Sequence, residues 1–97
     1  MPKDLTKALQ WFRKAAEAGN VEGQRNLGHA FAEGQGTPVD VVEAYQWLSV
    51  AAEKGDKAAK EELVGLTKTL SQQQLRQGQE RAAAFSRQSA NKPALVK

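Results

Sequence analysis

The chain contains no cysteine, and only one histidine, three prolines and two tryptophans occur among its 97 residues. Without cysteine it can form neither a disulfide framework nor a thiolate metal site. No apolar run approaches the ~20 residues that cross a bilayer, so membrane insertion is not expected. The composition, 40% hydrophobic and 26% charged, is typical of one small globular domain.

The charge is distributed unevenly along the chain. Residues 1–63 carry eight Lys or Arg against ten Asp or Glu, whereas residues 64–97 carry six against one. A basic C-terminal region can bind nucleic acid, and Arg76, Arg81, Arg87 and Lys92 would then make the contacts. The six cations are spread over the whole region without a dense cluster, so nucleic acid is not expected as a partner.

The sequence repeats itself with a period of 36 residues. Residues 1–27 and 37–63 share ten identical aligned positions, including the pairs Trp11 with Trp47 and Gly19 with Gly55. A repeat of this length is typical of solenoids built from helix pairs, in which each unit packs on its neighbours. Because both tryptophans recur at the repeat spacing, we expect both to pack in the core or between repeats.

Each unit predicts two helices. Apolar residues recur at a spacing of three to four after Asp4 and after Asp40, and Gly19 or Gly55 ends each run. The two aspartates are expected N-caps, and Asp40 with Glu43 has the spacing of a capping box. Two further helices are expected at about 21–33 and 57–70. Gly28 lies inside the first of these, which indicates that a neighbouring helix approaches closely there.

A fifth helix is predicted from a second capping box, formed by Ser71 and Gln74, to about Gln88. Its narrow apolar stripe includes Leu75, Ala82 and Phe85. We expect this stripe to dock on the helix at 57–70 and to cap the core. The organisation predicted from these patterns is one domain at 1–88 followed by a disordered tail at 89–97.

The segments KALQWFRKAAEAGN and NLGHAFAEGQGTPVDVVEAYQWLSVAAEKGD resemble the Sel-one-like repeat family, a tetratricopeptide-like class of adaptors. The positions that carry the resemblance are Leu27, Gly28, Phe31, Gly34, Gly36, Asp40, Ala44, Trp47, Ala51, Ala52, Glu53 and Gly55. It divides the chain into the second helix of a truncated repeat at 4–20, a full repeat at 21–56 and capping helices at 57–88. Gly23 and Thr37 depart from the family pattern and are expected to weaken packing slightly.

The resemblance implies an all-α fold, an α/α superhelix of the TPR-like solenoid type with about five helices in antiparallel pairs. It also implies that the chain is the C-terminal part of a longer bacterial array. The cytoplasm and the periplasm both accept a cysteine-free chain, and the periplasm is slightly preferred.

In such an array the first helices of successive repeats line a concave face, where a protein or peptide partner binds. The polar positions that the resemblance places there are Glu22, Arg25, Asn26, His29, Glu33, Glu61, Glu62 and Thr69.

No residue pattern indicates catalysis or a cofactor. His29 has no second histidine or cysteine with which to bind a metal or activate a nucleophile. The glycines Gly34 and Gly36 follow no strand, so they do not form a dinucleotide-binding turn. An enzyme, a metal site and a cofactor are therefore not expected.

The leading hypothesis is a protein-interaction scaffold or adaptor module. The alternatives are an accessory domain of a bacterial cell-envelope enzyme system and, less favoured, a nucleic-acid binder. The first helix lacks the helix that would precede it in a complete repeat, which leaves Leu5, Leu9 and Phe12 incompletely covered. Either a homodimer through this helix or a monomer with a frayed first helix is expected.

Overall fold

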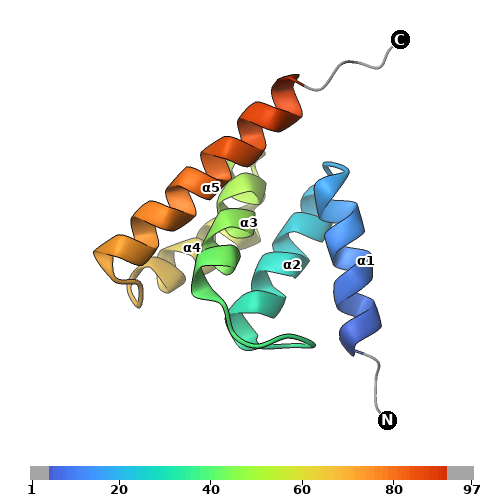
Figure 1. The fold of residues 1–97 in the computed structure, drawn as a ribbon, viewed down its shortest axis with the longest axis horizontal. Coiled ribbons are helices and arrows are strands. Elements are labelled where there is room, and N and C mark those ends of the chain that lie inside the picture. Colours follow the sequence, from blue (N-terminus) through green and yellow to red (C-terminus); the bar gives the residue numbers. More distant parts are fainter. Residues whose placement is uncertain (1–4, 92–97) are drawn as a thin grey trace.

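The computed structural model describes the backbone of residues 5–91 and shows five α-helices connected by short turns (Figure 1). Within this range there is no β-strand. The helices are α1 (Leu5–Glu17), α2 (Val21–Glu33), α3 (Val41–Glu53), α4 (Lys57–Thr67) and α5 (Gln72–Asn91). Consecutive helices from α1 to α4 pack against one another, which confirms the predicted all-α superhelix of helix pairs.

Each of the middle helices begins at a polar N-cap. The side chains of Asn20, Asp40 and Asp56 accept a hydrogen bond from the backbone N–H three residues later. The predicted capping box at Ser71 and Gln74 is present, with both reciprocal bonds at 3.1 and 3.0 Å. Asp4, the expected cap of α1, lies outside the described residues.

The capping box predicted at Asp40 is formed only in part. Asp40 caps the helix, but its own backbone N–H donates to the carbonyl of Phe31 rather than to Glu43. The Glu43 carboxylate is used elsewhere: it accepts from the indole Nε1 of Trp47 at 3.2 Å and from Arg81 at 3.4 Å. The capping box is incomplete because Phe31 binds the Asp40 N–H, while Trp47 and Arg81 hold the Glu43 carboxylate.

Glycine ends the second helices of both units in the same way. Gly19 and Gly55 have φ of 98° and 96°, and the residue that follows each donates its N–H to the carbonyl five positions back. This is the left-handed helix ending for which glycine has no steric penalty. The repeat therefore preserves the turn as well as the helix.

Two glycines of α2 allow close contacts with the helices on either side. A Cβ on Gly28 would lie 2.8 Å from Leu48 Cγ, so the predicted close approach is confirmed and the neighbour is α3. A Cβ on Gly23 would lie 2.6 Å from Ala15 Cβ on α1. The expectation that Gly23 weakens packing is wrong, because any larger residue there would push α1 away from α2.

The core lies where α2 and α3 meet α1. Its buried residues include Ala16, Leu27, Phe31, Ala44 and Trp47, and Leu9 and Phe12 of α1 pack partly buried against them. A second cluster of Leu48, Ala51 and Ala59 joins α3 to α4. Both clusters draw on the apolar positions that repeat every 36 residues.

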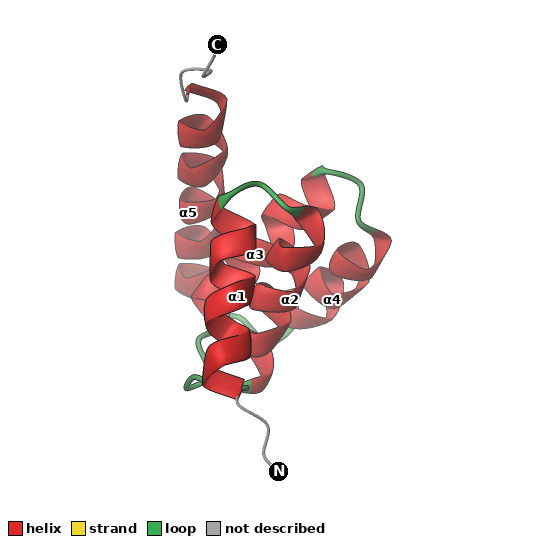
Figure 2. Ribbon diagram, turned by 90° about the vertical axis from the view of Figure 1, so that its right-hand side faces the viewer, coloured by secondary structure: helices red, strands yellow, loops and turns green. Residues whose placement is uncertain are grey.

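Helix α5 packs across α3, and its C-terminal turns extend beyond the other helices (Figures 1 and 2). The Phe85 ring meets Trp47 edge-on at 4.9 Å between centroids, Ala82 is buried, and a Cβ on Gly78 would lie 2.6 Å from the Tyr45 ring. The predicted apolar stripe is therefore used, but on α3 instead of the helix at 57–70. The stripe finds its partner there because Tyr45 and Trp47 offer the larger apolar surface.

The ends of the last two helices differ from the prediction by a few residues. Helix α4 stops at Thr67, where the Thr67 hydroxyl donates to carbonyls of the preceding turn. Helix α5 continues to Asn91, three residues past the predicted end at Gln88, so the expected tail does not begin at Ser89. The rest of that expected tail, residues 92–97, lies outside the described residues.

The prediction that both tryptophans are packed holds for one of them only. Trp47 is 3% exposed, whereas Trp11 is 71% exposed. Trp47 is covered by Phe85 of α5, and no helix among the described residues covers the equivalent surface of α1. Lys14 also stands on α1 at the repeat position where α3 has the buried Val50, so the surroundings of Trp11 are polar.

Candidate functional site

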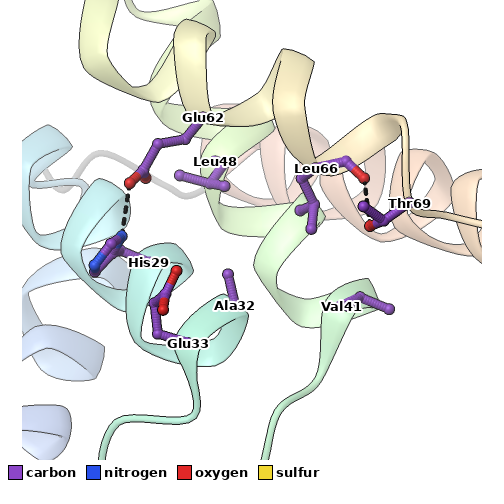
Figure 3. Close-up of a pocket in the computed structure, with 8 residues that line it drawn as sticks. All are labelled: His29, Ala32, Glu33, Val41, Leu48, Glu62, Leu66 and Thr69. Carbon is purple, nitrogen blue, oxygen red and sulfur yellow. Dashed lines mark hydrogen bonds and ion pairs between the residues drawn. The ribbon is translucent and has the colours of Figure 1, made fainter.

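Helices α2 and α4 are the first helices of successive units, and two polar pairs connect them. Arg25 Nε donates to Asp56 Oδ2 at 3.1 Å. One turn further along α2, His29 Nδ1 lies 2.6 Å from Glu62 Oε2 (Figure 3). These pairs join residues more than 30 positions apart, so they depend on the superhelix and not on local sequence.

A cleft of about 270 Å³ opens between these two helices next to the His29–Glu62 pair. Its apolar floor comes from three helices: Figure 3 shows Leu48 of α3 between α2 and α4, and Leu66 projecting from α4. Polar side chains stand at its edge. The residues that line it are His29, Ala32, Glu33, Val41, Leu48, Glu62, Leu66 and Thr69.

Asp56 has a double role at the α2–α4 junction. Its carboxylate accepts the Ala59 backbone N–H at 2.8 Å as the N-cap of α4 and also pairs with Arg25. The bond from Ala59 holds the pKa of Asp56 below its ordinary value, burial acts in the opposite direction, and Arg25 lowers the pKa further. The ionised form therefore stabilises both the start of α4 and its contact with α2.

Two buried side-chain oxygens have no hydrogen-bond partner within the described part of the chain, and they are Gln24 Oε1 and Glu62 Oε1. Gln24 is fully buried, and its Nε2 donates to the Ala16 carbonyl at 3.1 Å, so it links α2 to α1. Glu62 differs because it lines the cleft.

The structure brings together half of the eight residues predicted to bind a partner. His29, Glu33, Glu62 and Thr69 line the cleft. Arg25 and Asn26 are adjacent to one another, with Arg25 donating to Asn26 Oδ1 at 3.3 Å as well as pairing with Asp56. Glu22 and Glu61 are exposed on the same two helices and do not line the cleft.

The sequence analysis missed the apolar floor of the cleft and the role of Asp56. Leu48 and Leu66 follow the helical spacing of core residues, and that spacing does not indicate that they form the floor of a cleft. Asp56 could have been recognised as an N-cap, because it occupies the repeat position of Asn20. Its pairing with Arg25 depends on how α4 is placed beside α2.

A second hollow of about 260 Å³ lies on α1 alone. Lys7, Gln10, Trp11 and Lys14 line it. Of the cations considered for nucleic-acid contact, Arg81 pairs with Glu43, Arg76 and Arg87 are exposed on α5, and Lys92 lies outside the described residues.

None of the described helices combines the length and apolar character that a membrane span requires. The described side chains also contain no group of three or more His, Asp or Glu residues that could hold a metal ion.

The fold and the α2–α4 face define a helix-pair repeat protein with an open first-helix surface. The family model of the Sel1 repeat matches residues 1–20 and 21–56. These matches cover more than half of the chain, so the protein belongs to the Sel1 repeat family. Sel1 repeats generally form protein–protein interaction modules and are typically not catalytic.

A solved structure with the same fold is c5321, a protective antigen present in uropathogenic Escherichia coli strains that displays an SLR fold. It superposes with a TM-score of 0.80 at 29% sequence identity, and the match covers 100% of this chain and 23% of that protein. The chain thus spans about a quarter of the length of this relative. A comparison with curated proteins finds no match.

Proposed function

We propose that this domain binds a protein or peptide segment on the face formed by α2 and α4. The observation that carries the proposal is the cleft between these helices, which combines an apolar floor with polar groups at its edge. Such a combination suits recognition, because apolar contacts supply affinity and placed polar groups supply specificity. The Sel1 repeat family and the SLR fold of the E. coli relative support an interaction role and are consistent with a bacterial origin.

The proposal can be tested by placing a photo-reactive amino acid at Thr69, on the rim of the cleft. The matched control is the same amino acid at Glu80, an exposed position of α5. Cross-linking in extract of the source organism, followed by mass spectrometry, identifies proteins captured from Thr69 but not from Glu80. A purified captured protein is then titrated against Thr69→Arg and Glu80→Lys variants.

We expect Thr69→Arg to weaken binding by roughly tenfold or more, because it fills the rim of the cleft. Glu80→Lys should leave the affinity within about twofold. Equal weakening of binding by both variants, or capture from Glu80 alone, would show that the partner does not bind on the face formed by α2 and α4.

We also propose that α1 provides a second contact surface, through which two copies of the chain associate. Leu5 and Trp11 are 50% and 71% exposed, and large exposed apolar groups of this kind favour association. Sedimentation over a wide concentration range should show association that Trp11→Glu abolishes, while the melting temperature at a concentration where the chain is monomeric is unchanged. A chain that stays monomeric throughout that range would contradict this part of the proposal.

A further inference from the structure

The side chains around the α2–α4 cleft give it an acidic character. Glu33 and Glu62 line it, and neither lysine nor arginine is among its lining residues. The basic residue of α2 on this face, Arg25, is paired with Asp56 at 3.1 Å. The polar groups that remain are His29 and the Thr69 hydroxyl, which donates to the Leu66 carbonyl at 2.8 Å.

Glu62 is the residue of the cleft whose hydrogen bonding is incomplete. Its Oε2 is within 2.6 Å of His29 Nδ1, while Oε1 is a buried atom that has no partner among the described residues. A buried carboxylate oxygen without a donor is unfavourable, because it has lost water and gained nothing in return. If the carboxylate turns toward the cleft, a donor that enters from outside can remove this penalty.

The size and the floor of the cleft limit what that donor can be. A volume of about 270 Å³ is just below the roughly 300–1,000 Å³ of small-molecule pockets, so one long side chain suits it better than a cofactor. The floor of Leu48, Leu66 and Val41 is apolar and suits an aliphatic chain. Long basic side chains combine these properties, since their methylene groups pack on apolar surface while the charged end reaches polar groups.

We propose that the cleft receives an arginine side chain from the partner segment, with its methylene groups on the apolar floor and its guanidinium on Glu62. This inference deepens the proposed function and rests on it. The guanidinium donates to the Glu62 carboxylate, which turns to present Oε1, an atom that is buried in the free chain. Arginine fits better than lysine because its planar group carries five donors and can bind a carboxylate through two of them.

The test uses three small probes with the isotope-labelled full chain: arginine, citrulline and norleucine, each acetylated and amidated. Citrulline keeps the shape of arginine without its charge, and norleucine keeps only an aliphatic chain. Each probe is titrated into the parent chain, into the Glu62→Gln variant and into the control variant Glu80→Gln. NMR records the changes in backbone amide shifts. Thermal unfolding of each variant confirms that it is folded.

We expect blocked arginine to shift amides of α2 and α4 around the cleft, with a Kd roughly tenfold lower than that of blocked citrulline. Glu62→Gln should remove most of this preference, and Glu80→Gln should leave it unchanged. Equal binding of arginine and citrulline, or shifts confined to α1 or α5, would overturn the inference.

A failure of the arginine inference can be distinguished from a failure of the proposed function. If Thr69 captures a partner whose bound segment contains no arginine, the interaction surface stands and the choice of arginine is wrong. If blocked arginine binds the cleft but no partner is captured there, the chemistry of the cleft stands and the proposed function is wrong.

Discussion

Helices α1 and α3 come from the same repeated sequence, yet they have different surroundings. Trp47 of α3 is 3% exposed, and its indole donates to Glu43 while the Phe85 ring packs against it. Trp11 of α1 is 71% exposed and lies beside Lys7 and Lys14. The difference shows that a repeat motif specifies the helix and its turn, whereas burial of its outer face depends on whether another helix covers it.

The largest expected effect comes from removing the cover of α3. A chain ending at Leu70 lacks α5 and exposes Tyr45 and Trp47, and each large side chain loses about 1.5–3 kcal/mol of burial free energy. Because small domains are stable by only about 5–15 kcal/mol, we expect loss of cooperative thermal unfolding or aggregation. A chain ending at Gln88, which keeps Phe85, should melt like the parent. Cooperative unfolding of the shorter chain would contradict the capping role of α5.

The two tryptophans provide a matched pair of substitutions. Trp47→Ala should lower the free energy of unfolding by about 3–5 kcal/mol, because it leaves a cavity between α3 and α5. Trp11→Ala should change it by no more than about 0.5 kcal/mol, as expected for an exposed position. Urea unfolding of both variants at a concentration where the chain is monomeric measures the difference. Similar losses for both variants would mean that α1 is covered in solution.

The glycines of α2 test its contacts with α3 and α1. Gly28→Ala should destabilise the fold by about 1–3 kcal/mol, because its Cβ meets the fully buried Leu48. Gly23→Ala should cost less, since α1 has an open outer side and can shift away. The control is Gly65→Ala in α4: a Cβ there meets nothing within 4 Å, so the better helix propensity should stabilise by up to about 1 kcal/mol. A stabilising Gly28→Ala would show that the helices are not in close contact.

The caps of α2 and α4 differ in charge, and this difference predicts a small pH effect. Asn20 is neutral, whereas the pKa of Asp56 is lowered in the folded state. A lowered pKa means that Asp56 contributes stability above the ordinary aspartate pKa of about 4 and loses that contribution as the pH falls through its folded pKa. Asp56→Asn keeps a capping side chain. Its stability deficit at neutral pH should therefore shrink in urea titrations as the pH falls below the ordinary aspartate pKa of about 4.

The sequence was sufficient to predict the fold because its signals are local and repeated. The caps at Asp40 and Ser71, the glycine endings and the close approach at Gly28 each depend on a few neighbouring residues or on a single helix pair. The docking of α5 on α3 was not predictable in this way. It depends on which apolar surface competes best for the stripe around Ala82 and Phe85, and the spacing along one helix does not contain that information.

The candidate site was predictable in part for the same reason. The family resemblance placed His29 and Glu62 together on the face formed by the first helices. The cleft itself depends on the distance between α2 and α4, which the sequence does not encode locally. The apolar residues Leu48 and Leu66 therefore read as core positions only, and the partnerless oxygen of Glu62 could not be foreseen.

The central claim, that α2 and α4 form the binding surface, is tested most directly by mapping a bound partner segment. The segment cross-linked through Thr69 is prepared as a synthetic peptide and titrated into the isotope-labelled chain, and backbone amide shifts are recorded. We predict that the large shifts fall on the residues that line the cleft, including Ala32 and Glu62, and that the helix α5 is unaffected. Shifts concentrated on α1 around Trp11, or on α5, with the cleft unchanged, would contradict the account.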